Sequence, residues 1–207
     1  MPKPHYLPTR FQFVFAITAL LLAAIIAGTA YLYSTPFQSA GSSGTALVGG
    51  PFSLTDQAGR RVTEKDFIGK YTLIFFGYTF CPDVCPTELQ VMSAALESMG
   101  SKADRILPVF ITVDPARDTP EVVKQYVSNF HPRLMGLTGT QEQIAAAAKA
   151  YRVFYARAEN KADPANYLMD HSSIMYLMAP DGTFLKHFSY TTDSAELAQA
   201  LEKAIAL

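Results

Sequence analysis

The chain has 207 residues, a formal net charge of -1 at pH 7 and 49% hydrophobic residues. A charge so close to zero excludes the basic surface that nucleic-acid-binding proteins carry, so we expect no nucleic-acid partner. The length is sufficient for one well-packed domain with some residues left over. Much of the apolar excess lies near the N-terminus.

Residues 11–33 contain no charged side chain and read FQFVFAITALLLAAIIAGTAYLY. As a helix rising about 1.5 Å per residue, this segment would be about 34 Å long, which is enough to cross a hydrocarbon core of about 30 Å. Lys3 and Arg10 precede it, and the next basic residue is Arg60. The positive-inside rule therefore predicts that residues 1–10 are cytoplasmic and that the rest of the chain lies across the membrane.

A cleaved signal peptide is the alternative, because small residues lie near the end of the apolar run. The run is longer than the roughly 7–15 residues of a signal-peptide core, which favours an uncleaved transmembrane anchor. Residues 34–48 are rich in Gly, Ser and Ala and predict a flexible linker before a folded domain at 49–207. The segment before the anchor does not resemble an organelle presequence, so we expect a single-pass protein of a bacterial inner membrane with a periplasmic domain.

Apolar runs and helical patterns alternate along the folded part of the chain. The expected strands are 52–55, 61–63, 71–78, 106–113, 134–137, 153–158, 173–178 and 183–188. The expected helices are 86–99, 120–130, 140–151 and one after Ser194, and 159–170 is a polar loop. This order predicts an α/β domain with a thioredoxin-like fold, an extra N-terminal β-hairpin and helices on both faces of the sheet.

Polar residues at the starts of helices are expected to cap them, namely Thr119, Thr140 and Ser194. The loop before the first of these contains Asp114, Arg117 and Asp118. We interpret these three as a local cluster of ion pairs and capping groups, and docking of a partner is the weaker alternative.

The sequence GYTFCPDVCP contains both cysteines of the chain, Cys81 and Cys85. It follows the buried strand at 71–78 and precedes a helix, so the two thiols stand at the end of a central strand. A structural disulfide is the simplest alternative for an extracytoplasmic domain. It is disfavoured because a bridge across so few residues would constrain the unfolded chain little.

A proline follows each cysteine, and a residue before proline avoids helical geometry. The thiols are therefore expected in a loop and a cap, with the helix beginning at Pro86 and Glu88 in its first turn. The exposed N–H groups and the dipole of such a helix start stabilise thiolates. The spacing also allows the pair to bind one metal ion or to form a strained, reducible disulfide.

Two thiolates make an incomplete metal site, so a third donor is expected among the four histidines. His5 lies in the predicted cytoplasmic tail, His131 in a loop that ends a helix, and His187 in a hairpin strand. His171 lies at the junction of a polar loop and a strand. In a thioredoxin-like fold this junction lies next to the thiols, which makes His171 the expected ligand.

Two cysteines and a histidine form a soft set of few ligands. Such a set suits Cu(I), or Cu(II) with an added donor. Zinc in a structural site would take a fourth protein ligand, and an iron–sulfur cluster would need more thiolates. Copper is therefore the expected metal.

Three residues close to these ligands in sequence are weaker candidates for a role at the metal site. Asp170 is interpreted either as an acceptor that orients His171 or as a residue that caps the strand. Asp83 either shields the charge of the metal or serves the turn between the prolines. Met169 is a soft donor close to His171 in sequence, but packing is its simpler role.

Seven stretches of the chain, in order and spacing, resemble the SCO/SenC family of copper proteins that serve cytochrome c oxidase assembly: GGPFSLTDQAGRRVT, DFIGK, FFGYTFCPDVCP, VFITVDPARDTP, FHPR, GLTGT and DHSSIMYLMAPDGTF. The resemblance implies a membrane-anchored thioredoxin-like domain that binds copper through Cys81, Cys85 and His171. It also implies a client, the binuclear copper centre of oxidase subunit II. Other copper chaperones or thioredoxin-like reductants are further implied partners.

Three functions are compatible with these residues. A copper-binding assembly factor, rather than a conventional enzyme, is the leading hypothesis. A thiol–disulfide oxidoreductase that reduces the client's copper-ligand cysteines is the second, with Cys81 and Cys85 as its redox-active pair. A peroxiredoxin-like peroxidase ranks last, because Tyr78 occupies the position at which the peroxidase pattern has threonine.

Overall fold

The computed structural model describes residues 18, 20–24, 26–27, 48–158 and 166–206. Residues Ala46–Leu207 belong to one compact unit. The predicted anchor at 11–33 and the predicted linker at 34–48 lie largely outside the described residues. Within the described ranges, no helix combines the length and the apolar character needed to span a membrane.

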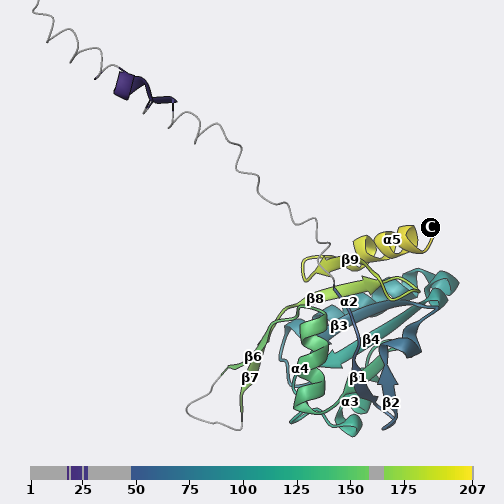
Figure 1. Ribbon diagram of the computed structural model, residues 1–207. Coiled ribbons are helices and arrows are strands. Elements are labelled where there is room, and N and C mark those ends of the chain that lie inside the picture. The colour runs from purple at the N-terminus through teal and green to yellow at the C-terminus, as the bar shows by residue number, and fades with distance from the viewer. Residues whose placement is uncertain (1–17, 19, 25, 28–47, 159–165, 207) are drawn as a thin grey trace, which may run out of the picture. The chain divides into compact units, whose positions relative to one another are not determined.

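Most strands of the domain join in one seven-stranded sheet, in the order β2-β1-β5-β4-β3-β8-β9 (Figure 1). Its members are β1 (Ser53–Asp56), β2 (Arg61–Thr63), β3 (Tyr71–Gly77), β4 (Ile106–Thr112), β5 (Met135–Thr138), β8 (Ile174–Met178) and β9 (Phe184–Ser189). Two more strands, β6 (Tyr155–Ala158) and β7 (Leu168–His171), form a separate two-stranded ribbon.

The centre of the sheet is β3, which pairs in parallel with β4 and antiparallel with β8. Its successive residues Phe75 and Phe76 are both fully buried, although they point to opposite faces. A strand buried on both faces reads as a continuous apolar run, which is why residues 71–78 were recognisable. The carboxyl end of this strand is therefore fixed by core packing on both sides.

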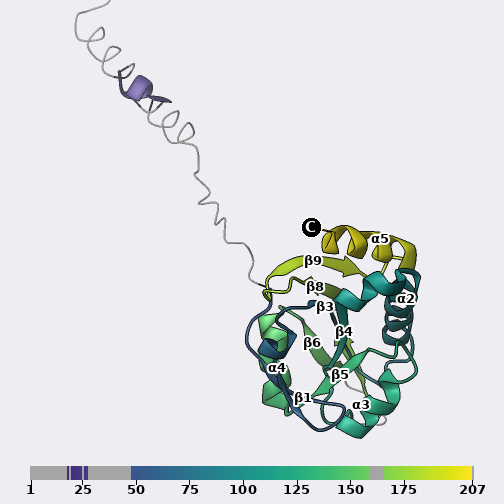
Figure 2. The ribbon, with the colours of Figure 1, turned by 90° about the vertical axis from the view of Figure 1, so that its right-hand side faces the viewer.

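Helices cover both faces of the sheet, as expected. They are α2 (Val84–Ser98), α3 (Pro120–Val127), α4 (Gln141–Ala150) and α5 (Ser194–Ile205), with short 3-10 turns η1 (Glu64–Phe67) and η2 (Gly100–Arg105). Figure 2 shows α4 on one side of the sheet and α2, α3 and α5 on the other. The parallel units β3–α2–β4 and β4–α3–β5 step in the same direction across the sheet, so the right-handed crossover rule places α2 and α3 on the same face.

The N-terminal hairpin β1–β2 is also confirmed. It extends the sheet by antiparallel pairing of β1 with β5. The turn is closed by Asp56, whose carboxylate accepts hydrogen bonds from the backbone N–H groups of Ala58 and Arg60. Gly59 in this turn has a φ of +79°, which glycine adopts without strain.

The predicted caps Thr119 and Thr140 are confirmed, because each side chain accepts a hydrogen bond from a backbone N–H in the first turn of its helix. The third was wrong by one residue. Asp193 caps α5 by accepting from the N–H of Glu196 at 2.8 Å, and Ser194 is the first helical residue. Helix α3 is also shorter than expected, since it ends at Val127.

The expectation of a loop throughout 159–170 was wrong at its end, where the chain forms a strand. Residues 168–171 form β7 and pair with β6, with Tyr155 opposite His171. The ribbon extends from the main sheet (Figure 1), and Tyr155 and Met169 pack against the core on one of its faces. Leu168 and Asp170 are exposed while Met169 and His171 are half-buried, so each face of β7 carries one apolar and one polar residue and the sequence shows no apolar alternation.

Close packing of α3 on β5 gives a test of the fold. A Cβ atom on Gly136 would lie 2.3 Å from Val123 Cγ1 and 3.0 Å from Val127 Cγ1. We expect Gly136→Ala to lower the free energy of unfolding by about 1–3 kcal/mol, measured by urea denaturation of the full-length chain. Val123→Ala in the same chain should recover part of this loss, since it removes the nearest methyl group. An unchanged unfolding midpoint in Gly136→Ala would contradict the packing described here.

Candidate metal centre

The two thiols lie just after the carboxyl end of the central strand β3. Chain direction changes after Gly77, and the N–H of Cys81 donates to the carbonyl of Tyr78 at 3.3 Å. Helix α2 begins at Val84, so Cys85 lies in its first turn. The expectation that both cysteines avoid helical geometry was wrong for Cys85. Pro86 is tolerated there because first-turn N–H groups have no intrahelical acceptor.

The earlier helix start also changes the place of Glu88. It lies beyond the first turn and is buried, with an exposed fraction of 2%. Burial raises the pKa of Glu88 to about 7. This carboxyl group therefore does not serve the helix start as expected.

Gly77 makes room for the Cys85 sulfur. A Cβ atom at this position would lie 2.9 Å from Cys85 Sγ and 2.9 Å from Phe75 Cε1. Such a distance is shorter than real Cβ contacts, so any larger residue would displace the thiol or the core around it. The Cys85 side chain itself is fully buried, whereas Cys81 is half-buried and closer to solvent.

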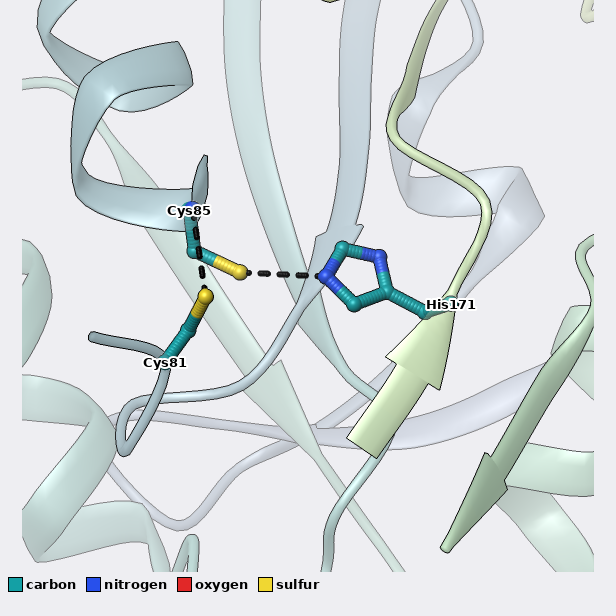
Figure 3. A group of neighbouring side chains, drawn as sticks. All are labelled: Cys81, Cys85 and His171. Carbon is teal, nitrogen blue, oxygen red and sulfur yellow. Dashed lines mark hydrogen bonds between the residues drawn. The ribbon is translucent and has the colours of Figure 1, made fainter. Parts of the chain in front are cut away.

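The structure brings His171 to the thiols, as the sequence predicts (Figure 3). His171 is the last residue of β7, and its Nε2 atom lies 3.2 Å from Cys85 Sγ. The N–H of Cys85 points to Cys81 Sγ at 3.4 Å. The donor atoms of the three side chains all lie within 4.8 Å of one another, which is close enough for all three to hold one metal ion.

The imidazole of His171 has its second nitrogen engaged. Nδ1 lies 3.2 Å from the carbonyl oxygen of Ser172. A carbonyl only accepts hydrogen bonds, so Nδ1 carries the proton in this contact and Nε2 presents its lone pair toward the thiols. The group that orients the ring is thus the Ser172 carbonyl. Asp170 is exposed on the same strand, and strand alternation points its side chain to the opposite face.

The two thiols have unequal proton affinities. A hydrogen bond from the Cys85 thiol lowers the pKa of Cys81 well below its usual range. The backbone N–H groups of Cys85 and Asp83 also lower the pKa of Cys81, whereas burial opposes them. The same interaction with Cys81, together with burial, raises the pKa of Cys85. The site therefore pairs an accessible thiolate with a buried thiol.

Aromatic side chains enclose the histidine. The Tyr78 ring packs edge-on against His171, with a centroid separation of 5.9 Å, and Phe75 does the same at 6.1 Å. Burial raises the pKa of Tyr78 to about 12, and the nearby sulfur of Cys81 contributes in the same direction. In the sequence, Tyr78 stands out only as a departure from the peroxidase motif. The place of Tyr78 between the central strand and Cys81 is the sequence feature that could have indicated its position beside the metal centre.

The remaining candidates lie elsewhere or serve the backbone. His187 stacks on Phe184 in the β8–β9 hairpin, and His131 accepts from the N–H of Arg133. The carbonyl of Asp83 accepts a hydrogen bond from Thr87 at the start of α2, and the Asp83 side chain is exposed. Met169 is half-buried and packs against the core, in agreement with its simpler interpretation.

Comparisons with known proteins agree with this geometry. A family model described as SCO1/SenC matches residues 40–206. The chain is 46% identical to protein SCO1 homolog 1, mitochondrial, of Arabidopsis thaliana, over 79% of this chain and 49% of that protein. It is 45% identical to the human protein SCO1 homolog, mitochondrial, over 76% of this chain and 53% of that protein. The chain thus spans about half the length of these two relatives.

Two solved structures share the fold. The crystal structure of Arabidopsis thaliana ScoI with copper bound has a TM-score of 0.72 and 45% identity, covering 77% of this chain and 98% of that one. The structure of Bradyrhizobium japonicum ScoI with copper bound has a TM-score of 0.70 and 48% identity, covering 75% of this chain and 98% of that one. The mixed α/β, thioredoxin-like fold expected from the sequence is thereby confirmed.

The unequal thiols predict a pH profile for alkylation. Because the pKa of Cys81 is lowered, its thiolate is present throughout the neutral range. The rate of its reaction with iodoacetamide should therefore change little from about pH 6 to about pH 8, whereas an unperturbed thiol reacts about tenfold faster per pH unit below its pKa of about 8.5. Cys85, buried and with a raised pKa, should remain unmodified. Mass spectrometry of the reduced chain would contradict this by finding Cys85 labelled first.

Proposed function

The chain belongs to the SCO1/SenC family, and on that premise we propose that it is a copper-binding assembly protein that holds one copper ion through Cys81, Cys85 and His171. The observation that carries the proposal is the convergence of three donor atoms within 4.8 Å of one another. These donors come from two separate segments, which only the fold brings together.

The chemistry of the donor set fits copper. Thiolate sulfur and imidazole nitrogen are ligands that Cu(I) prefers, and Cu(II) accepts them with an added donor. Among the described residues, Cys81, Cys85 and His171 form the group of three potential metal ligands that the structure brings together. This group lacks the fourth protein ligand that a structural zinc site has. The copper bound in the plant and Bradyrhizobium ScoI structures supports the same assignment for this chain.

We assign different roles to the three ligands. The sulfurs are fixed by β3 and α2, and Cys85 is buried against Gly77. His171 is a neutral ligand from a ribbon outside the main sheet. During transfer, an incoming thiolate of the client displaces this neutral imidazole more readily than it displaces a thiolate. His171 therefore sets the affinity and leaves first.

The client in this proposal is the binuclear copper centre of cytochrome c oxidase subunit II. The family resemblance supports it, and other copper chaperones or thioredoxin-like reductants are the further proposed partners. The uncharged segment at 11–33 supports a single membrane anchor, with residues 1–10 cytoplasmic and the domain periplasmic in a bacterial inner membrane. A tethered domain of this kind reaches a client in the same bilayer.

The second candidate, a thiol–disulfide reductase, is favoured by the unequal thiols. The accessible Cys81 thiolate would attack a client disulfide and form a mixed disulfide, releasing one client thiolate. Cys85 would then lose its proton and attack Cys81, which releases the second client thiolate. The client gains two electrons, and Cys81 and Cys85 end as a disulfide. In this role His171 only tunes the proton affinities of the thiols.

Copper binding by the His171→Ala variant separates the two functions. We expect the full-length chain in detergent to bind one Cu(I), and the substitution to weaken binding by at least about 100-fold, since even loss of a partner of a ligand costs about 10–100-fold. Competition with a chromophoric Cu(I) chelator measures both the affinity and the stoichiometry. Reduction of a client peptide disulfide is followed in parallel.

His187→Ala is the matched control, because this histidine is exposed in β9 and distant in sequence from the thiols. It should bind copper as the parent does. If His171→Ala also binds copper as tightly as the parent while still reducing disulfides, the reductase becomes the better description of the chain.

A further inference from the structure

The two halves of the metal centre come from different sheets. The thiols follow β3 of the seven-stranded sheet, whereas His171 ends β7 of the separate ribbon. His171 and Cys85 are 86 positions apart along the chain. β7 is linked to the main sheet by β8, which pairs with β3 through Met175 and Phe75. Side chains of a third segment, residues 114–118, contact both the turn that carries the thiols and the residue that enters β7.

Asp118 stabilises the turn that carries Cys81, which is called the thiol side below. Its carboxylate accepts hydrogen bonds from the N–H of Thr79 at 3.0 Å and from the Thr79 hydroxyl at 2.6 Å. It also accepts from the Thr112 hydroxyl at 2.5 Å, and the whole residue is fully buried. Thr79 stands two positions before Cys81 in the same turn. Asp118 is thus not the local capping group that the sequence suggested.

Asp114 and Arg117 contact the residue before β7, the strand that ends in His171; this part of the centre is called the histidine side below. Their ion pair, expected from the sequence, is confirmed with 2.5 Å between Arg117 Nε and Asp114 Oδ2. The second carboxylate oxygen of Asp114 accepts from the Tyr167 hydroxyl at 2.8 Å. Arg117 Nη1 donates to the Tyr167 carbonyl at 3.0 Å. Tyr167 immediately precedes β7, the strand that ends in His171.

Stacking joins the two sides. The Arg117 guanidinium lies 3.6 Å from the ring centroid of Tyr167 and 4.6 Å from that of Phe80, which is the neighbour of Cys81. Arg157 of β6 lies 3.8 Å from the Tyr167 centroid. Arg117 therefore contacts both the thiol turn and the residue that enters β7, with hydrogen-bond geometry that lysine lacks.

We propose that residues 114–118 form the positioning element of the metal centre, setting the distance between the thiols and His171. Asp118 fixes the turn before Cys81, and Asp114 with Arg117 fixes the entry to β7. These are positioning residues that act through His171 and the thiols. The inference rests on the copper-binding function proposed above.

Tyr167→Phe and Arg117→Lys test the histidine side in the full-length chain. Tyr167→Phe removes the hydroxyl that donates a hydrogen bond to Asp114. Arg117→Lys keeps the positive charge but removes the planar guanidinium group. Arg60→Lys is the matched control, since Arg60 also pairs with an aspartate, Asp56, but in the β1–β2 turn. Gly136→Ala controls for a general loss of stability.

The first readout uses the chain without metal. Hydrogen exchange followed by mass spectrometry should show faster exchange at residues 166–172 in Tyr167→Phe and Arg117→Lys. The two controls should leave this segment unchanged relative to the rest of the domain. Unchanged exchange in both test variants would overturn the proposal.

The second readout is a double-mutant cycle with His171→Ala. We expect Tyr167→Phe to weaken Cu(I) binding about three- to tenfold in the parent and less than about twofold beside His171→Ala, because residues that act through one ligand are not additive. An equal loss in both backgrounds would overturn positioning through His171. A parent chain that binds no copper overturns the copper function alone, and hydrogen exchange then decides the positioning role.

Discussion

Burial of the central strand is the constraint on which the site depends. Because β3 packs into the core on both faces, its carboxyl end cannot shift, and Gly77 leaves space there for one sulfur atom. Cys85 occupies that space from the first turn of α2. The position of one ligand is therefore set by the same packing that stabilises the domain.

The other two candidate ligands, Cys81 and His171, are held by polar contacts in addition to packing against the core. Cys81 lies in a turn that hydrogen-bonds to the buried Asp118, and His171 lies on a ribbon whose preceding residue, Tyr167, hydrogen-bonds to Asp114. Such contacts are specific in direction and individually modest in energy. A site built in this way combines a sulfur fixed by core packing with two donors held partly by polar contacts, which agrees with the proposed role of holding and transferring a metal ion.

The unequal thiols explain why copper binding and thiol–disulfide exchange can use the same side chains. A half-buried thiolate beside a buried thiol is an arrangement for attack and resolution in disulfide exchange. The same thiolate, with an imidazole whose Nε2 faces the sulfurs, is a soft metal site. Occupancy by copper consumes the groups that disulfide exchange would need, so the two activities compete for one set of atoms.

Local patterns in the sequence determined the buried central strand and the caps Thr119 and Thr140, because periodicity and capping chemistry are properties of short segments. They also indicated Cys81 and Cys85 as candidate ligands, and the expected fold added His171; the structure brings these three side chains together. The local patterns did not reveal β7, since each face of this strand carries one apolar and one polar residue and no apolar alternation results. They also misplaced the start of α2, because tolerance of Pro86 depends on the helix turn around it. Only the tertiary structure decided what orients His171 and what Asp118 holds, since those contacts join residues that are distant in sequence and depend on a packed core.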